Sequence, residues 1–428
     1  MKKIKYPGKE DWEVFTQRPE LEKKDLNALV KNILTAVKEK GDEALFEFSE
    51  KYDGIQLVDL KVSEEEIREL VLQQELKEAI QVAKNNIEKF HQSQLIEEPV
   101  VETTKGVSCW RRSVGIEKVG LYIPGGSAPL FSTVLMLGIP AVLAQCKEVV
   151  LCTPPDKEGK IHPAILYTAN LVGIKNIYKV GGAQAIAAMA FGTESISKVH
   201  KIFGPGNQYV TKAKELVQQE AVAIDIPAGP SEVLVIADKT CRPEFVAADL
   251  LSQAEHGEDS QVMLLSNNAK VIDEVNLEME KQLEQLPRKA ITAKALENAS
   301  SILLNSMEEC IEFSNVYAPE HLILATEQAD DLLDNITNSG SVFIGNYSCE
   351  SAGDYASGTN HTLPTNGFAR TYSGVSMDSF LKKITFQKLT AEGIQKLGPT
   401  IEIMAEAEEL MAHKNAVSIR LQELRNGR

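Results

Sequence analysis

A glutamine and a histidine close an apolar segment near the middle of the chain. The segment Phe245–Leu251 is followed by Gln253 and His256, and Gly257 then ends the pattern. Residues three apart lie on neighbouring rows of one helix face. An amide oxygen and an imidazole are therefore expected together at a helix end, which is half of a metal or substrate site.

Histidines and acids among turn residues are candidates for the other half. Four of the seven histidines stand at element ends or in loops, where functional groups concentrate. Asp354 belongs to the glycine-bracketed stretch Gly353–Pro364. Two imidazoles and two oxygen ligands form a donor set that a zinc-like divalent ion accepts, although no spacing rule brings them together. The candidate ligands are Gln253, His256, Asp354 and His413.

Two chemistries compete for the reactive groups. Glu320 and His321 precede an apolar strand pattern and offer a general-base route, in which a neutral imidazole takes an alcohol proton and a carboxylate activates water. Cys109 or Cys152 could instead trap an aldehyde as a thiohemiacetal, or be a buried, reduced thiol, because the six cysteines show no metal or disulfide spacing. A metallohydrolase with Glu320 as base and a non-catalytic metal- or nucleotide-binding scaffold also remain open.

A repeated unit of apolar strand, glycine-rich turn and helix must position these groups. Four such units lie between Val119 and Gln219, and a second set of strands lies between Glu232 and Gly345. This alternation predicts parallel sheets with helices on both faces. Right-handed crossovers place the glycine turns at the carboxyl edges. We expect these edges of the two sheets to face each other across a cleft.

The expected fold is α/β, with two Rossmann-like lobes, an N-terminal arm and a helical C-terminal tail. The arm covers residues 1–20. Residues 21–118 and 231–373 form the first lobe, with the metal and catalytic candidates, and residues 119–230 form the second. The tail, residues 374–428, is expected to contact another subunit.

Charge and hydropathy exclude several classes of protein. A formal net charge of -16, from 45 Lys plus Arg against 61 Asp plus Glu, repels a polyanion, so no nucleic-acid partner is expected. The apolar run Val134–Ala144 is shorter than the ~20 residues that cross a bilayer, so no membrane partner is expected either. The first residues lack the apolar stretch of a secretory signal, which favours the cytoplasm. The turn Gly204–Tyr209 has two glycines of the dinucleotide fingerprint but Tyr209 in place of the third.

Eight ordered stretches, which together cover nearly the whole chain, resemble motifs of the histidinol dehydrogenase family. They are Val119–Ala141, Gly181–Ala188, Gly204–Asn207, Pro227–Asp238, Phe245–Gly257, Ala318–Leu322, Gly353–Pro364 and Glu408–Arg420. The resemblance implies an arrangement of lobes like that of aldehyde dehydrogenases. It also implies oxidation of L-histidinol by two NAD+ and water to L-histidine, through a retained aldehyde.

The resemblance also assigns roles to individual residues. It implies one zinc ion per subunit, held by the four candidate ligands, with His321 taking the alcohol proton and Glu320 activating water. NAD contacts are implied for residues 119–230, at Tyr122, Gln184 and Asn207. Substrate contacts are implied at Ser231, Gln253, His256, His321, Asp354, His361, Glu408 and His413.

The same resemblance implies a homodimer whose tail completes the partner's site. Glu408 and His413 would then come from the second subunit. They are five residues apart, about 140° around an ideal helix, so both can face one site only if the helix bends or ends between them. We predict an interruption near Ala412–Asn415.

Overall fold

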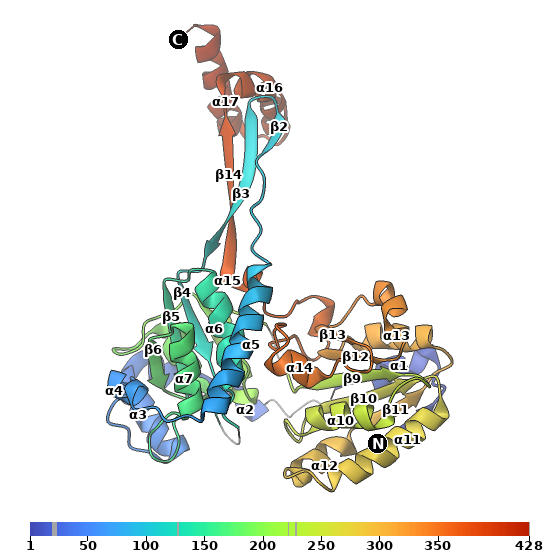
Figure 1. Ribbon diagram of the computed structural model, residues 1–428. Coiled ribbons are helices and arrows are strands. Elements are labelled where there is room, and N and C mark those ends of the chain that lie inside the picture. Colours follow the sequence, from blue (N-terminus) through green and yellow to red (C-terminus); the bar gives the residue numbers. More distant parts are fainter. Residues whose placement is uncertain (19–23, 126–127, 221, 227–228, 428) are drawn as a thin grey trace. The chain divides into compact units, whose positions relative to one another are not determined.

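The computed structural model describes residues 1–18, 24–125, 128–220, 222–226 and 229–427. The chain divides into two compact units (Figure 1). The first combines Met1–Gln94 with Ile116–Phe380, and the second combines Leu95–Gly115 with Leu381–Arg428. Within the described ranges, no helix combines the length and the apolar character needed to cross a bilayer.

A five-stranded parallel sheet lies in the first unit, with strand order β6-β5-β4-β7-β8. In chain order this is 3-2-1-4-5, the arrangement of a Rossmann-like lobe. Its strands are β4 (Lys118–Tyr122), β5 (Glu148–Thr153), β6 (Asn176–Lys179), β7 (Lys201–Phe203) and β8 (Ala223–Ile224). The connecting helices are α6 (Phe131–Leu143), α7 (Pro163–Val172), α8 (Gly182–Phe191) and α9 (Gln208–Gln218). The four predicted strand-turn-helix units are therefore confirmed.

A six-stranded parallel sheet, also in the first unit, repeats this order from β9 onward as β11-β10-β9-β12-β13. Every residue of β9, β10 and β12 is buried, because helices cover both faces of the sheet. The strands are β9 (Glu232–Ala237), β10 (Gln261–Ser266), β11 (Ser300–Leu303), β12 (His321–Ala325) and β13 (Ser341–Ile344). The helices are α10 (Pro243–Ala254), α11 (Ala269–Leu283), α12 (Lys289–Glu297), α13 (Met307–Tyr317) and α14 (Glu350–Tyr355). Helix α15 (Met377–Phe380) packs instead on α6 of the five-stranded lobe.

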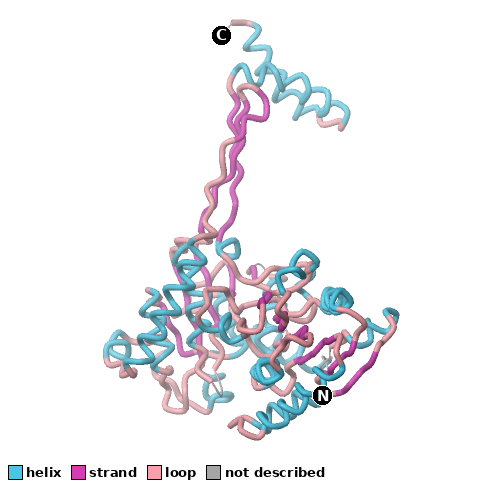
Figure 2. Tube along the Cα trace, turned by 45° about the vertical axis from the view of Figure 1, so that its right-hand side comes forward, coloured by secondary structure: helices cyan, strands magenta, loops and turns pink. Residues whose placement is uncertain are grey.

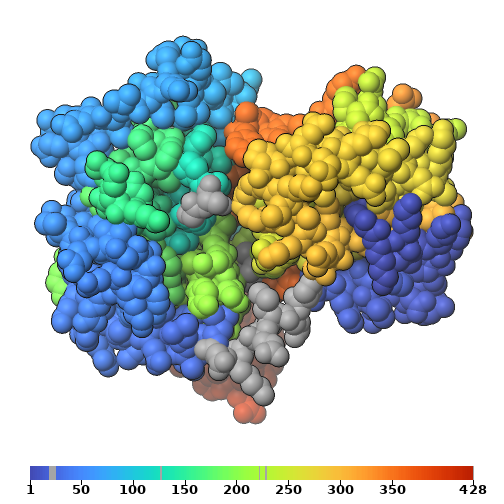
Figure 3. All heavy atoms as spheres, turned by 90° about the horizontal axis from the view of Figure 1, so that it is seen from below, coloured from blue at the N-terminus to red at the C-terminus, as the bar shows by residue number. Residues whose placement is uncertain are grey.

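The N-terminal residues belong to this second sheet, so the expected arm is wrong for residues 1–18. Strand β1 (Lys2–Lys5) pairs in parallel with β11. In α1 (Trp12–Phe15), Trp12 is 4% exposed, and its ring packs on Phe313 with the centroids 5.2 Å apart. Figure 3 shows these dark-blue residues against the yellow segment. A polar edge strand with Ile4 as its only apolar residue gives no alternation to detect. Residues 19 and 20 lie outside the described residues.

The helices that follow pack on the five-stranded sheet, which corrects the expected first lobe for residues 24–94, while residues 21–23 lie outside the described residues. Helix α2 packs on α8 and α9, and α5 packs on α6. Their bounds are α2 (Lys24–Lys40), α3 (Asp42–Phe48), α4 (Glu64–Arg68) and α5 (Gln74–Gln92). Val30 and Val37 share one core with Ile186. An amphipathic pattern identifies the buried face of a helix but not the sheet that covers it.

The second unit is built on a three-stranded antiparallel sheet, with strand order β14-β3-β2 (Figure 2). Its elements are β2 (Val101–Thr104), β3 (Val107–Gly115), β14 (Leu381–Leu389), α16 (Ala391–Ala407) and α17 (Met411–Arg425). The helical tail is confirmed from Ala391. Two expectations are corrected, because Leu381–Leu389 forms a strand and the strand that it pairs with, β3, was assigned to the first lobe.

The predicted interruption between Glu408 and His413 exists, but at a different place. Helix α16 ends at Ala407 and α17 begins at Met411. Glu409 has a φ of 60°, a left-handed conformation that an α-helix cannot contain. The expected break at Ala412–Asn415 is wrong, since His413 lies inside α17.

We expect Trp12→Ala to lower the free energy of unfolding by about 3–5 kcal/mol, because it removes a buried indole from a packed core. Urea denaturation followed by far-UV circular dichroism measures the change. The control is Val14→Ala, since Val14 is 62% exposed and its truncation should cost within about 0.5 kcal/mol. Equally small changes for both variants would mean that the segment is only an arm.

Candidate active site

The catalytic candidates gather at the amino edge of the six-stranded sheet. Ser231 precedes β9, and Glu320 precedes β12, which begins at His321. A helix between parallel strands runs antiparallel to them, so the carboxyl end of α10, with Gln253, returns to the same edge. The expectation that both sheets use their carboxyl edges is therefore wrong for this sheet. It holds for the five-stranded sheet, where Tyr122 ends β4.

One residue holds both expected bases. The backbone N–H of Glu232 donates to Glu320 Oε2 at 2.8 Å, and its carbonyl oxygen lies 3.1 Å from His321 Nδ1. Because a carbonyl only accepts, Nδ1 carries a proton, so the neutral form of the ring has its lone pair on Nε2. This Nε2 has no hydrogen-bond partner within the described residues, and it lies 3.5 Å from Asp354 Oδ1.

The side chain of Glu232 is fixed by an arginine from the N-terminal segment. Arg18 Nε and Nη2 donate to the two carboxylate oxygens of Glu232, each at 2.8 Å. Arg18 also donates to the carbonyl oxygen of Tyr317 at 2.9 Å and lies 3.8 Å from the centre of the Tyr317 ring. The backbone N–H of Asn366 donates to Glu232 Oε1 at 2.8 Å. The buried carboxylate is thus paired and hydrogen-bonded, the condition under which a buried charge is tolerated.

A cluster of metal-binding side chains lies beside the bases. Ligand atoms of His256, Glu350 and Asp354 all lie within 4.8 Å of one another. With bonds of about 2.1 Å, one ion could contact all three after small side-chain rotations. One imidazole and two carboxylates form a donor set that zinc accepts. These residues therefore fit a divalent ion.

Glu350 was not anticipated from the sequence. It begins α14 and is buried, four residues before Asp354, so the two carboxylates share one helix face. With the side-chain amide oriented to satisfy its hydrogen bonds, Gln253 donates to both Glu350 oxygens, at 3.3 Å for Oε2. The signal that could have revealed Glu350 is this spacing of two acids four residues apart.

Burial and neighbouring charges shift the proton affinities in the cluster. Burial raises the pKa of Glu320 to about 8. Burial lowers the pKa of His321, but Glu350, Glu320 and Asp354 outweigh it and raise this pKa well above its usual value. Three carboxylates around one imidazole therefore stabilise the imidazolium that forms when His321 takes a proton.

A cavity of about 920 Å³ opens onto this cluster and is lined by Ser231, His256, Glu320 and His361. His361 Nδ1 lies 2.9 Å from the carbonyl oxygen of Asp354, and its Nε2 lies 3.1 Å from Thr133 Oγ1 of α6. His361 therefore connects the two lobes of the first unit. Pro205 and Asn207, from the carboxyl edge of the five-stranded sheet, also line this cavity.

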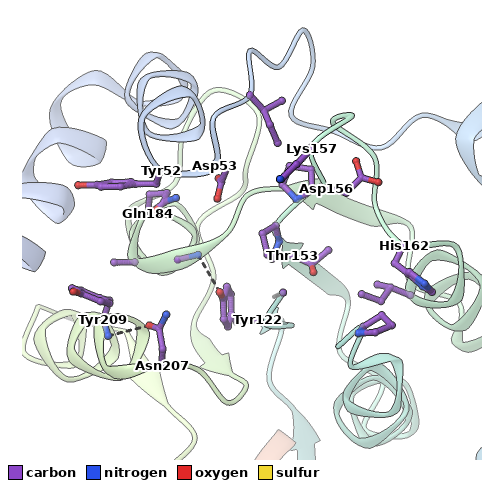
Figure 4. Close-up of a pocket in the computed structure, with 18 of the residues that line it drawn as sticks. Tyr52, Asp53, Tyr122, Thr153, Asp156, Lys157, His162, Gln184, Asn207 and Tyr209 are labelled. Carbon is purple, nitrogen blue, oxygen red and sulfur yellow. Dashed lines mark hydrogen bonds between the residues drawn. The ribbon is translucent and has the colours of Figure 1, made fainter. Parts of the chain in front are cut away.

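A second cavity, of about 720 Å³, lies at that carboxyl edge and is lined by Tyr122, Gln184 and Asn207 (Figure 4). The Tyr122 hydroxyl accepts from the backbone N–H of Gly182 at 3.0 Å. Asn207 Oδ1 caps α9 by accepting from the N–H groups of Tyr209 and Val210 at 3.1 and 3.2 Å. Since Asn207 lines both cavities, the cavities adjoin at the start of α9.

The turn before α9 requires a glycine. Gly204 has a φ of 126°, and a Cβ there would lie 2.1 Å from the carbonyl oxygen of Tyr122. Any other residue would push β7 away from β4, which carries Tyr122.

The remaining candidates are Glu408, His413 and the two cysteines. Glu408, between α16 and α17, and His413, in α17, are both exposed within the second unit. Cys152 is fully buried, and burial raises the pKa of its thiol far above the ordinary value, which argues against a thiolate nucleophile. Cys109 is the third residue of β3, in the second unit.

Comparison with known proteins gives consistent similarities. The family model for histidinol dehydrogenase matches residues 16–421. The histidinol dehydrogenase of Bacteroides thetaiotaomicron is 58% identical over 427 residues, covering 99% of this chain and all of that protein. That of Yersinia pestis is 51% identical, covering 98% of this chain and 95% of that protein. The crystal structure of histidinol dehydrogenase from Elizabethkingia anophelis superposes with a TM-score of 0.98 at 61% identity, covering 99% of each chain.

We expect Asp354→Ala to weaken zinc binding by about 100-fold or more, because a ligand should matter at least as much as the residues that support ligands. Metal content after dialysis against a competing chelator, measured by mass spectrometry, tests this. The control is Asp259→Ala, an exposed acid in the wall of the same cavity. Equal zinc retention in both variants would contradict the assignment.

Proposed function

Because the chain belongs to the histidinol dehydrogenase family, we propose that it oxidises L-histidinol to L-histidine through L-histidinal. The reaction takes two NAD-dependent steps, the last of histidine biosynthesis. The observation that carries the proposal is the pair Glu320 and His321, held on Glu232 beside a cavity that adjoins a second one. Because the two cavities adjoin, a substrate carbinol bound in one could meet a dinucleotide bound in the other.

In the first step, His321 is the base. Nε2 takes the hydroxyl proton of histidinol while the carbinol carbon transfers a hydride to NAD+, giving histidinal and NADH. The hydrogen bond from Nδ1 to the Glu232 carbonyl keeps the lone pair on Nε2, and Asp354 at 3.5 Å stabilises the new imidazolium.

In the second step, Glu320 is the base. Its carboxylate takes a proton from water as the oxygen adds to the aldehyde carbon. The resulting hydrate anion transfers a second hydride to NAD+ and becomes the carboxylic acid of histidine, which leaves as the carboxylate after releasing its proton to water. Deep burial makes the ionised carboxylate a stronger base than one in water.

The metal has a positioning role in this scheme. Gln253, His256, Asp354 and His413 are the proposed ligands, with Glu350 orienting the Gln253 amide. When bound, zinc would orient histidinol and polarise its carbinol oxygen. Ser231, His361 and Glu408 complete the substrate contacts.

We further propose a homodimer in the cytoplasm. The tail of one subunit would bring Glu408 and His413 to the site of the other, a role supported by the exposure of both side chains on the second unit. Tyr122, Gln184 and Asn207 would contact NAD, in the cavity at the carboxyl edge of the five-stranded sheet.

We expect two NADH for each histidine formed when the purified protein is mixed with L-histidinol and NAD+. Absorbance at the NADH band together with chromatography of the products measures this ratio. Omitting NAD+ should abolish all product, whereas a metallohydrolase with Glu320 as base would still turn over. One NADH with release of free aldehyde, or no turnover, would contradict the proposal.

The pH dependence of the rate of L-histidinal oxidation should follow the ionisation of Glu320. Its carboxyl group, with a pKa near 8, is mostly protonated at pH 7 and ionises as the pH rises. Oxidation of L-histidinal should therefore accelerate by up to about tenfold per pH unit below about pH 8 and level off above it. In Glu320→Gln this limb should vanish along with most of the rate. A wild-type rate that does not change between about pH 6 and 9 would rule out this role.

A further inference from the structure

One residue that lines the cavity at the edge of the five-stranded sheet, Asp53, has a carboxylate oxygen without a partner. Asp53 ends the helical turn η2 (Ser49–Asp53) and lines this cavity with Tyr122 and Gln184. Asp53 Oδ2 is buried and has no hydrogen-bond partner, and no ion pair forms at Asp53 within the described part of the chain. Figure 4 shows the side chain directed toward the ends of the strands. Such an oxygen costs free energy unless a ligand donates to it.

The chain that follows Asp53 locates it on one side of the sheet. The backbone N–H of Lys179 in β6 donates to the Leu60 carbonyl at 2.7 Å, and that of Val62 donates to the Ile177 carbonyl at 2.9 Å. Leu57 approaches the loop after β5 at Gly159. Asp53 therefore belongs to the β5–β6 side. In Rossmann-like lobes an acid reached from the second strand binds the adenosine ribose, and β5 is the second strand here.

Asp156, the acid that follows β5 in the sequence, already accepts hydrogen bonds from its own loop. Asp156 Oδ1 accepts from the backbone N–H groups of Glu158 and Lys160 at 2.8 and 2.9 Å. It closes its own loop, as turn aspartates do. Lys157, a cation that lines the same cavity, is exposed, so water and salt screen its attraction for a phosphate.

We propose that Asp53 accepts hydrogen bonds from the adenosine ribose hydroxyls and repels a 2′-phosphate, so that the cavity selects NAD+ over NADP+. This inference rests on the proposed dinucleotide site. It assigns cofactor selection to Asp53, which comes from outside the sheet. In most Rossmann-like lobes an acid that follows the second strand binds the ribose instead. A carboxylate accepts from a ribose diol through both oxygens, whereas a phosphate at the same place would bring two anions together.

The test is direct binding of NAD+ and NADP+ to the full-length protein without histidinol, by calorimetry. Wild type should prefer NAD+. In Asp53→Asn, which keeps one acceptor oxygen but removes the charge, the ratio of NAD+ to NADP+ affinity should fall by about tenfold or more. Asp156→Asn, in the same cavity, should keep the wild-type ratio. Thermal denaturation confirms folding, since Asp53→Asn removes an unpaired charge and should not lower the melting temperature.

Each result of these binding measurements either supports or overturns the role of Asp53. An unchanged ratio in Asp53→Asn overturns the inference, including the case in which both affinities fall equally, because Asp53 would then not contact the ribose that carries the 2′-phosphate. A loss of preference in Asp156→Asn, with Asp53→Asn unaffected, assigns selection to the other acid and also overturns it. Wild-type protein that binds neither dinucleotide refutes the proposed function itself.

Discussion

The site depends on the way Glu232 is held. Its carboxylate forms a bidentate pair with Arg18, and its backbone N–H and carbonyl fix Glu320 and His321. Removing one partner of a buried ion pair costs about 3–5 kcal/mol, because the other charge is left unpaired. Glu232, the first residue of β9, is therefore anchored by Arg18 through its side chain and holds the two proposed bases through its backbone. Arg18 thus links the N-terminal segment to the candidate active site, although no residue of that segment is proposed to contact the reacting atoms.

The two sheets have the same strand order but use opposite edges. The five-stranded sheet offers its carboxyl edge, with glycine turns and helix starts, which suits an anionic cofactor. The six-stranded sheet offers its amino edge, where strand starts and helix ends bring buried acids and histidines together. The cavity lined by Asn207 and Glu320 joins these environments. A surface of glycine turns and helix starts and a cluster of buried acids and histidines therefore meet within one unit.

Much of the fold could be predicted from the sequence, because strong periodicity marks buried elements. The four strand-turn-helix units predicted between Val119 and Gln219 and the second set of strands predicted between Glu232 and Gly345 are both present in the structure. The expectations failed where partners are distant in the chain. Neither the pairing of β1 with β11 nor the packing of α2 against α8 has a local signature. Strand β14 alternates weakly, and all its partners are in β3.

The candidate site was predicted by resemblance more than by pattern. Spacing indicated Gln253 and His256 as a pair, but it could not bring Asp354 to them. Glu350 and Glu232 were missed, since a buried acid in a sequence looks the same as an exposed one until its partners are known. The sequence analysis also placed the candidate site at the wrong edge of the six-stranded sheet. Open α/β sheets usually bind ligands at their carboxyl edges, but here the candidate residues lie at helix ends and strand starts, which are at the amino edge.

The edge pairing of β1 also bears on the order in which the protein can form during synthesis. Residues Lys2–Lys5 are synthesised about 300 residues before their partners in β11, which begin at Ser300. At about 5–20 residues per second, the N-terminal strand waits on the order of 15–60 s for its neighbour. Meanwhile the five-stranded sheet, complete by Ile224, can already fold around its own core. Strand β1 is therefore synthesised long before it can be placed in its sheet, and Arg18 likewise precedes its partner Glu232 by more than 200 residues.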